Sequence, residues 1–395
     1  MIRQPQQQDM DEQTNHSHKL KIGVIFGGRS GEHEVSLLSA QSVMAALDRK
    51  KYDVVPVGIT RDGRWLTGNV VAALTEGNTD VQPTALLPDP QISGLMALQE
   101  TNAEPSGLTA VTHLDVLIPV LHGTYGEDGT VQGLLELAGL PYVGAGVVGS
   151  AVGMDKAIFK HVMAANGLPV LPWELVTRQE WIMDETAVLD TLEAALSYPM
   201  FTKPANLGSS VGISKCKNRA ELVAGLHEAA QYDRRIVVEQ GIRVRELEVA
   251  VLGNEAPAAS VVGEIRPRRD FYDYTAKYLA TPDSDDYSEL MIPAELDEET
   301  AVTVQTLALR AYQAIDCAGM GRVDLLLDTD TGALYLNEIN TIPGFTRISM
   351  YPKLWEASGL PYPQLLDKLI DLAIERFAEK SNLKTTFSAS EPSST

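Results

Sequence analysis

The sequence is poor in cysteine and has no long apolar run. Only Cys216 and Cys317 occur among its 395 residues, and neither has the spacing of a metal site or a disulfide framework. Such sparse cysteine usage suits a reducing compartment, so we expect a cytoplasmic protein. A membrane-spanning helix takes about 20 consecutive apolar residues, and no run approaches that length. A membrane protein is therefore not expected.

Basic residues are also scarce. Lys and Arg together number 32 against 53 Asp and Glu, which gives a net charge of -21. A surface of this sign repels nucleic acid and anionic membranes, so neither is an expected partner. An anionic small molecule would need cations gathered locally against this background.

The chain is too long for one ordinary core, and its patterns predict three folded parts between two tails. Polar residues 1–18 lack the apolar segment of a secretory signal and are predicted to be a disordered tail. Residues 381–395 are rich in Ser and Thr and are predicted to be a second tail. Between them we predict parts at 19–150, 151–240 and 241–380.

Residues 19–150 read as alternating strands and helices, which predicts an α/β part with a parallel, doubly wound sheet. The expected strands are 21–28, 54–60, 116–123 and a short one at 141–146, with helices after the first and third; residues 67–110 have no clear pattern.

The next two parts read as α+β. A helix is predicted at 154–169, ending near Gly167 and Pro169, and another near 219–230. A half-buried strand at 246–253 and a long helix at 297–315 precede a hairpin formed by residues 321–330 and 333–340.

The hairpin carries the strongest chemical signal. Alternation places Arg322 and Asp324 on one face of its first strand, and Glu338 and Asn340 on one face of the second. Carboxylates this close repel unless a cation lies between them, and Mg²⁺ prefers such oxygen ligands. A solvated strand face with salt bridges is the alternative.

Glycine-rich segments supply three more candidate sites. In 206–212, NLGSSVG, small residues let backbone N–H groups approach phosphate oxygens, with Lys203 just upstream; a flexible hairpin loop is the alternative. GGRSGEHEVS (27–36) and HGTYGEDG (122–129) follow strands, where α/β sheets bind ligands. There Glu32 could hold an ammonium group or merely favour the helix dipole. His122 could donate to an anion, although a lone histidine is more often structural.

Two loops complete the pattern. The aromatic segment FYDYTAKYLA (271–280) could be a lid over a site or a partner interface. NTIPGFTRISMYPK (340–353) follows the metal-binding strand, with Gly344 for close approach and Ser349 as a free hydroxyl. No nucleophile elbow or Ser–His–Asp arrangement occurs, so covalent catalysis by an enzyme nucleophile is not expected.

In this order, the motifs resemble those of the D-alanine–D-alanine ligases, members of the ATP-grasp superfamily. Besides the segments above, MDK, EVAVLG, GRVDLLL, NEINTIPGFT and SMYP carry the resemblance, which covers about residues 20–375. It implies the ATP-grasp fold, with ATP held between the second and third parts. It also implies ligation of two D-alanines through a D-alanyl phosphate, in the synthesis of peptidoglycan precursors, by a homodimer.

The resemblance also implies a role for each motif residue. ATP would be bound by its phosphates, adenine and ribose through Lys156, Lys203, Ser210, Glu239, Ile242, Glu246 and Lys277. Asp324, Glu338 and Asn340 would hold two Mg²⁺ ions, or Mn²⁺ in their place. The first D-alanine would bind through its ammonium at Glu32, with Ser209 and Tyr278 in the same network and His122 nearby. Arg322 and the Gly344 amide would form the oxyanion hole, and Ser349 and Met350 would bind the carboxylate of the second D-alanine.

Rival functions differ at identifiable positions. Relatives that make D-alanyl-D-lactate often have Phe where this chain has Tyr278, so the dipeptide is the expected product. Another ATP-grasp amino-acid ligase is the nearest alternative. A non-catalytic nucleotide-binding regulator would be expected to lose Arg322 or a metal-binding carboxylate, and both are present. A Rossmann oxidoreductase would need a glycine spacing that fails after Gly28.

Overall fold

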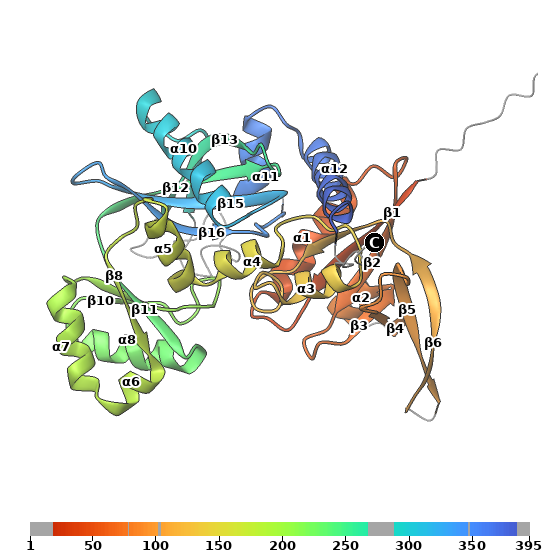
Figure 1. Cartoon of the computed structure of the whole chain (residues 1–395), viewed down its shortest axis with the longest axis horizontal. Coiled ribbons are helices and arrows are strands. Elements are labelled where there is room, and N and C mark those ends of the chain that lie inside the picture. Colours follow the sequence, from red (N-terminus) through yellow and green to blue (C-terminus); the bar gives the residue numbers. More distant parts are fainter. Residues whose placement is uncertain (1–18, 78, 102–103, 268–287, 347, 385–395) are drawn as a thin grey trace, which may run out of the picture.

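The computed structural model describes residues 19–77, 79–101, 104–267, 288–346 and 348–384. Three sheets form separate lobes in Figure 1, with α4 and α5 lying between them. Lys277 and Tyr278 lie outside the described residues.

The first sheet has the strand order β6-β5-β4-β3-β2-β1-β7. β1 pairs in parallel with β2 and β7, as the sequence predicts, whereas the neighbours from β2 to β6 are antiparallel. The unassigned segment 67–110 supplies most of these antiparallel strands. The bounds are β1 (Leu20–Gly27), β2 (Tyr52–Ile59), β3 (Trp65–Gly68), β4 (Val81–Leu86), β5 (Gly94–Thr101), β6 (Glu104–His113) and β7 (Val116–Val120).

One predicted strand of this part is wrong. Residues 141–146 make a single bridge between Tyr142 and Leu117 rather than a strand. Gly144 then takes a φ of +100° and turns the chain away from the sheet. The helices of this part are α1 (His33–Ala46), α2 (Val70–Glu76) and α3 (Thr130–Leu137).

The helix predicted at 154–169 is α5 (Lys156–Ala165), and a separate helix that was not predicted, α4 (Val147–Met154), ends just before it at Asp155. The Asp155 carboxylate accepts a hydrogen bond from the Ile158 amide (3.0 Å) and so starts a new helix. Gly167 has a φ of +64°, which confirms its predicted place just after the helix. Lys156 is therefore fixed at the first turn of α5.

The second sheet, β10-β9-β11-β8, is covered by α6, α7 and α8. Trp181, Leu192 and Leu226 are among the side chains buried between these helices and the sheet. The bounds are β8 (Trp173–Thr177), α6 (Arg178–Met183), α7 (Glu185–Ala195), β9 (Met200–Pro204), β10 (Ser214–Cys216), α8 (Arg219–Tyr232) and β11 (Arg235–Gln240).

The third sheet is antiparallel, in the order β14-β13-β12-β15-β16, and α10 packs on it. β15 and β16 form the predicted hairpin, with Asp324 directly opposite Glu338 and Arg322 opposite Asn340. The bounds are β12 (Val244–Leu252), β13 (Ala258–Pro267), β14 (Ser288–Met291), α10 (Glu298–Ala314), β15 (Met320–Asp328) and β16 (Leu334–Asn340).

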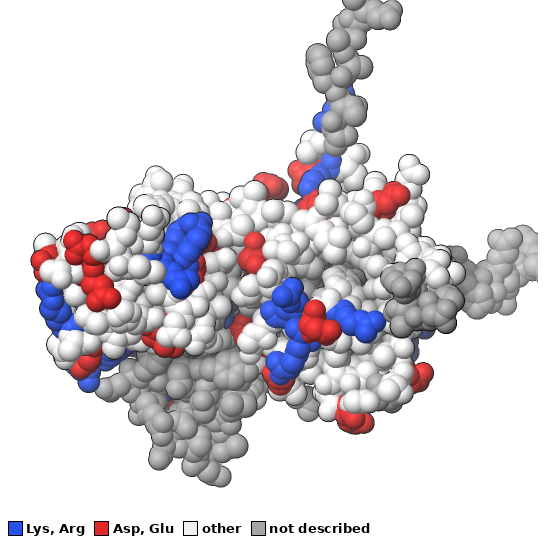
Figure 2. Space-filling model, turned by 90° about the horizontal axis from the view of Figure 1, so that it is seen from below, with Lys and Arg blue, Asp and Glu red and all other residues white. Residues whose placement is uncertain are grey.

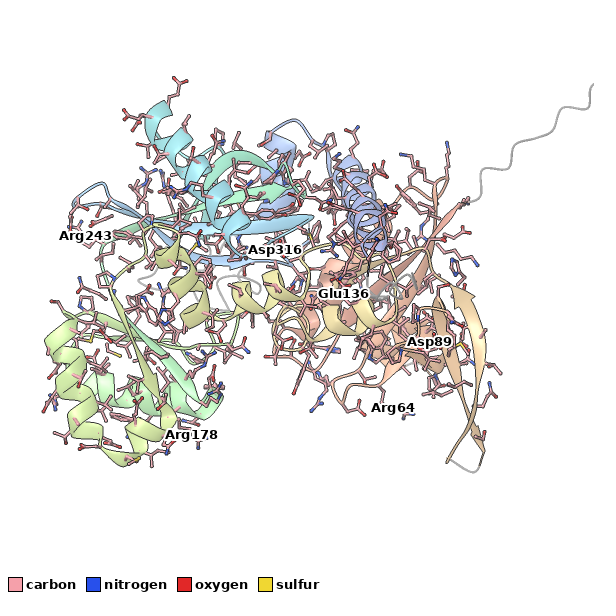
Figure 3. The ribbon with its side chains drawn as sticks, in the orientation of Figure 1. Arg64, Asp89, Glu136, Arg178, Arg243 and Asp316 are labelled. Carbon is pink, nitrogen blue, oxygen red and sulfur yellow. The ribbon has the colours of Figure 1, made fainter. Side chains whose placement is uncertain are left out.

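The last helices, α11 (Met350–Ala357) and α12 (Tyr362–Ser381), return the chain to the first sheet. Leu366 and Leu369 of α12 share a core with Ile118 and Val120 of β7. Lys380 pairs with Glu136 of α3, which is labelled in Figure 3. The first and third sheets are thereby held together, whereas the predicted division at 150 and 240 stays a prediction.

On the face shown in Figure 2, positive charge is not gathered into one large field. In Figure 2, basic and acidic side chains lie in small mixed groups with uncharged surface between them. Among the described residues, no helix combines the length and the apolar character needed to cross a bilayer.

Candidate active site

Two adjoining cavities lie where the three sheets approach one another. One, the Glu32 cavity, has a volume of about 250 Å³ and reaches from α1 to the start of α11. The other, the Glu239 cavity, has a volume of about 500 Å³ and lies between the second and third sheets. They share wall residues, among them Lys156, Ser209, Arg322 and Glu338. A ligand in one would therefore be close to a ligand in the other.

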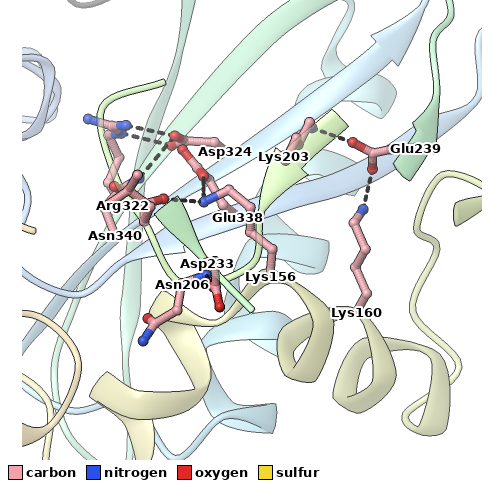
Figure 4. Close-up of polar contacts among 11 residues, drawn as sticks. Lys156, Lys160, Lys203, Asn206, Asp233, Glu239, Arg322, Asp324, Glu338 and Asn340 are labelled. Carbon is pink, nitrogen blue, oxygen red and sulfur yellow. Dashed lines mark hydrogen bonds and ion pairs between the residues drawn. The ribbon is translucent and has the colours of Figure 1, made fainter. Parts of the chain in front are cut away.

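The β15–β16 hairpin forms the floor common to both cavities. Nε and Nη2 of Arg322 donate hydrogen bonds to the two carboxylate oxygens of Asp324, at 2.7 and 2.6 Å. The Asn340 amide donates to the same carboxylate at 3.1 Å, and Lys156 Nζ lies 3.7 Å from Glu338 (Figure 4). Burial opposes the charge on Arg322, but Asp324 and then Glu248 outweigh it, so its pKa lies well above the usual value.

A buried ion-pair cluster lies at the far wall of the Glu239 cavity. Glu239 is 2% exposed and pairs with Lys203 of β9 and Lys160 of α5 (Figure 4). Burial opposes ionisation of this carboxyl, but the two ammonium groups prevail and lower the pKa of Glu239 to about 2. The arrangement leaves lone pairs on a fixed, ionised carboxylate that lines the cavity.

The loop after β9 has the backbone form expected of an anion-binding loop. Ser209 and Ser210 have φ values of +51° and +58°, a left-handed form that is strained for non-glycine residues. The Ser209 hydroxyl is buried and has no hydrogen-bond partner among the described residues. Lys156 Nζ donates to the Leu207 carbonyl at 2.8 Å and holds this loop beside α5. The strained backbone of Ser209 and Ser210 points to a ligand here.

Glu32 lies at the end of the Glu32 cavity, only 7% exposed, just before α1. Gly123 and Gly208 lie against its carboxylate, since a Cβ atom at these positions would be 2.7 and 3.2 Å from Glu32 Oε2. The two glycines come from the predicted loops at 122–129 and 206–212. The fold thus brings together three motifs that are far apart in sequence.

His122 is buried, and both ring nitrogens are hydrogen-bonded. Nδ1 lies 3.1 Å from the Ile342 carbonyl, and Nε2 lies 3.3 Å from the Ser39 hydroxyl. Burial lowers the pKa of His122 to about 4, so the ring is neutral and donates from Nδ1. This histidine ties β7 to the loop after β16, and its ring also lines the Glu32 cavity.

The loop after β16 closes the other end of the Glu32 cavity. Ser349 Oγ accepts a hydrogen bond from the Thr346 amide at 3.0 Å, and a Cβ atom at Gly344 would lie 2.8 Å from it. Ser349 precedes α11, and Met350 is its first residue. The amide groups at this helix N-terminus favour a negatively charged ligand group.

Every predicted site residue that the structure describes lines one of these cavities. The Glu32 cavity has Glu32, His122, Lys156, Ser209, Arg322, Glu338, Asn340, Gly344, Ser349 and Met350. The Glu239 cavity adds Lys203, Ser210, Glu239, Ile242, Glu246 and Asp324. This proximity is a finding, whereas the role assigned to each residue stays a prediction.

Three buried charged residues in or beside the cavities were not among the candidates from the sequence. Glu127 lies within the quoted HGTYGEDG segment, Glu248 follows Glu246 by one strand period, and Lys160 follows Lys156 by about one helical turn. Burial and the nearby Glu32 raise the pKa of Glu127 to about 8, and its carboxyl accepts a hydrogen bond from the Gly123 amide at 2.7 Å. Their spacing from the quoted motif residues could have indicated that they lie near the site. Their burial, however, is seen only in the folded structure.

Comparison with known proteins agrees with this geometry. The family model described as "D-ala D-ala ligase N-terminus" matches residues 21–145, and "D-ala D-ala ligase C-terminus" matches 162–371. The D-alanine–D-alanine ligase of Heliobacterium modesticaldum is 52% identical, covering 93% of this chain and 98% of that protein. That of Geobacillus kaustophilus is 47% identical, with coverages of 93% and 98%.

Solved structures agree as well. The D-alanine–D-alanine ligase of Coxiella burnetii superposes with a TM-score of 0.75 at 37% identity, covering 92% of this chain and 96% of that one. VanG D-Ala:D-Ser ligase from Enterococcus faecalis superposes with a TM-score of 0.78 at 36% identity, covering 90% of this chain and 100% of that one. Fold and site together define an ATP-grasp ligase, a class that uses ATP to join a carboxylate to an amine. Within that class, the chain belongs to the D-alanine–D-alanine ligase family.

Proposed function

We propose that this protein joins two D-alanines into D-alanyl-D-alanine, forming ADP and phosphate, for the synthesis of peptidoglycan precursors. The observation that carries the proposal is the shared wall of the two cavities. Lys156 and Arg322 line both cavities, Glu32 lines one and Lys203 the other, so the groups proposed to bind ammonium, oxyanion and phosphate would surround one continuous space. The predicted parts 19–150, 151–240 and 241–380 would each contribute one wall.

In the first step, a carboxylate oxygen of the first D-alanine attacks the γ-phosphorus of ATP, and ADP leaves. Glu32 would hold the D-alanine ammonium, and Lys156, Lys203 and Lys277 would bind the phosphates. Because both reactants are anionic, these cations lower their repulsion. The strained loop at Ser209 and Ser210 would close over the phosphates and exclude water from the acyl phosphate.

Asp324, Glu338 and Asn340 would hold two Mg²⁺ ions, or Mn²⁺ in their place. Their fit rests on the donor set, since two carboxylates and an amide oxygen on facing strand positions are the hard oxygen ligands such ions take. When bound, the ions would neutralise charge on the phosphates.

In the second step, the amine of the second D-alanine attacks the acyl carbon, and phosphate leaves from the tetrahedral intermediate. Arg322 and the Gly344 amide would bind the oxyanion, where one donor is typically worth a factor of about a hundred to a thousand in rate. Ser349 and the amide of Met350 would bind the carboxylate of the second D-alanine. His122 would keep the loop after β16 in position through the Ile342 carbonyl.

Assay of the purified chain with ATP and Mg²⁺ tests this proposal. Phosphate release is compared for D-alanine, L-alanine, and D-alanine with D-lactate or D-serine, and products are identified by mass. Phosphate release with D-alanine alone, yielding the dipeptide, is the expected result. If the chain binds ATP but D-alanine does not stimulate phosphate release, the proposal is wrong. The chain would then use another acceptor or act as a non-catalytic regulator.

Two further proposals concern the setting of the enzyme. We expect it to act in the cytoplasm, where ATP is present and where its two buried, free thiols stay reduced. We also expect a homodimer, which sedimentation of the purified chain would test.

A further inference from the structure

Glu248 is a buried carboxylate to which no role is assigned above. It lies on β12, is 5% exposed and lines both cavities. The strand register places it beside Asp324 on β15. A buried carboxylate at such a place needs a positive partner, because its desolvation is otherwise costly.

That partner is Arg322, which lies between two carboxylates. Nε and Nη2 of Arg322 donate to Asp324, whereas Glu248 Oε2 lies 3.1 Å from Nε as an ion pair. Since Nε carries a single hydrogen, directed at Asp324, Glu248 acts here mainly through its charge. Figure 4 shows the guanidinium facing Asp324.

Arg322 and a divalent cation would therefore compete for the Asp324 carboxylate. A divalent cation would need an Asp324 oxygen, yet both are engaged by Arg322 and one also accepts from Asn340. When Asp324 turns to a cation, the guanidinium loses a bidentate partner. Asp324 and Glu248 both form ion pairs with Arg322.

We propose that Glu248 is a positioning residue that retains the Arg322 guanidinium in the shared wall when Asp324 binds a divalent cation. The Nε–H bond then turns to Glu248, and the remaining N–H groups stay available to an oxyanion. This inference rests on the proposed function for the roles of Asp324 and Arg322. It predicts that Glu248 lowers the competition between Arg322 and the cation for Asp324.

Binding of Mg²⁺·ADP without D-alanine provides a test that does not depend on turnover. In Glu248→Gln, the Mg²⁺ concentration for half-maximal ADP binding, measured by calorimetry, should rise about tenfold, as expected when one charge within 4–6 Å is removed. In turnover, kcat should fall at least about tenfold, and KM for D-alanine should change less than about threefold. Glu248→Thr, which removes the charge and suits a strand, should behave like Glu248→Gln.

Two matched variants separate charge from packing. Glu264→Gln removes another buried glutamate of the same sheet, one that pairs with Arg245 and Arg266 away from both cavities. It should lower stability but leave the Mg²⁺ dependence unchanged. Glu248→Asp keeps the charge and should stay within about threefold of the unaltered chain.

Several results would overturn the proposal. These are an unchanged Mg²⁺ dependence in both Glu248→Gln and Glu248→Thr, an equal loss in Glu248→Asp, or the same shift in Glu264→Gln. Product analysis of the unaltered chain decides the proposed function separately. Dipeptide formation by that chain together with an unaffected Glu248→Gln would refute only the role of Glu248.

Discussion

Arg322 holds both carboxylate oxygens of Asp324, two residues further along the same strand, at 2.7 and 2.6 Å. The pair keeps a guanidinium and a candidate metal ligand at adjacent positions on one face of β15. If Asp324 binds a divalent cation as proposed, an existing ion pair would have to rearrange. This relationship makes Asp324 the most informative position for substitution.

Asp324→Asn should abolish ligation while the fold survives. The amide keeps the shape and can still accept a hydrogen bond from Arg322, but it removes a charge that the cations need. We expect D-alanine-dependent phosphate release to fall at least about a hundredfold, as for loss of a group that stabilises transition-state charge. Circular dichroism should show an unchanged fold.

Asp330→Asn is the matched control, since Asp330 is exposed and pairs only loosely with Arg243, at 3.3 Å. It should have normal activity. Retained activity of Asp324→Asn with normal Mg²⁺ dependence would refute the metal-binding role.

Glu127 should make the stability of the protein depend on pH. Its pKa is raised from 4.5 to about 8, so the folded chain keeps a proton that the unfolded chain releases. The stabilising contribution of Glu127 is therefore fully present below the pKa of this carboxyl in the unfolded chain. It is lost as pH rises through about 8, the pKa in the folded chain.

Glu127→Gln mimics the protonated carboxyl and should remove this loss. Its melting temperature relative to the unaltered chain should rise between pH 5 and 8.5, because each pKa unit corresponds to about 1.4 kcal/mol. Glu76→Gln, at an exposed carboxyl, should show no such trend. Parallel melting curves for Glu127→Gln and the unaltered chain would contradict the assignment.

The sequence predicts the parts of the site that depend on neighbouring residues better than the parts that depend on residues far apart in the chain. Alternation correctly predicts that Arg322 and Asp324 share one strand face and that Glu338 and Asn340 share another. The register that sets Asp324 opposite Glu338 depends on an irregularity between Asp324 and Leu325, which alternation does not predict. The contact of Glu32 with Gly123 and Gly208 was not predictable from periodicity, because three loops meet there. The family resemblance implied only that Glu32 and Ser209 belong to one network, with His122 nearby.

Long-range packing also explains the errors and omissions in the fold. The antiparallel strands between 65 and 113 have mixed patterns, since part of that sheet is exposed. The failed strand at 141–146 depends on the one bridge between Tyr142 and Leu117, and the start of α5 depends on the hydrogen bond from the Ile158 amide to the Asp155 carboxylate. Local propensity does not specify such contacts.

Lys160→Met should impair ATP use more than D-alanine use. It removes one of two ammonium groups from buried Glu239, while Met preserves most of the apolar stem. We expect stability to fall by less than the about 3–5 kcal/mol that an uncompensated buried charge costs, because Lys203 still pairs with Glu239. KM for ATP should rise at least about tenfold, and KM for D-alanine should change less than about threefold.

Lys368→Met removes an exposed lysine of α12 and serves as the control. It should leave both constants unchanged. An equal rise in both KM values for Lys160→Met would indicate a general structural defect rather than a role in holding Glu239.

Tyr278→Phe should shift acceptor choice toward D-lactate. A tyrosine hydroxyl in the network of Glu32 and Ser209 would favour the dipeptide, and its removal should raise D-lactate use relative to D-alanine. Competition between the two acceptors, with products separated by mass, measures this ratio. An unchanged ratio would show that another residue determines the acceptor.

The central claim, activation of the first D-alanine by phosphorylation in the shared space, is tested most directly with carboxyl-¹⁸O-labelled D-alanine. The attacking carboxylate oxygen should leave with the phosphate, so each phosphate released with dipeptide should contain one ¹⁸O atom. Dipeptide formation with unlabelled phosphate would contradict the claim.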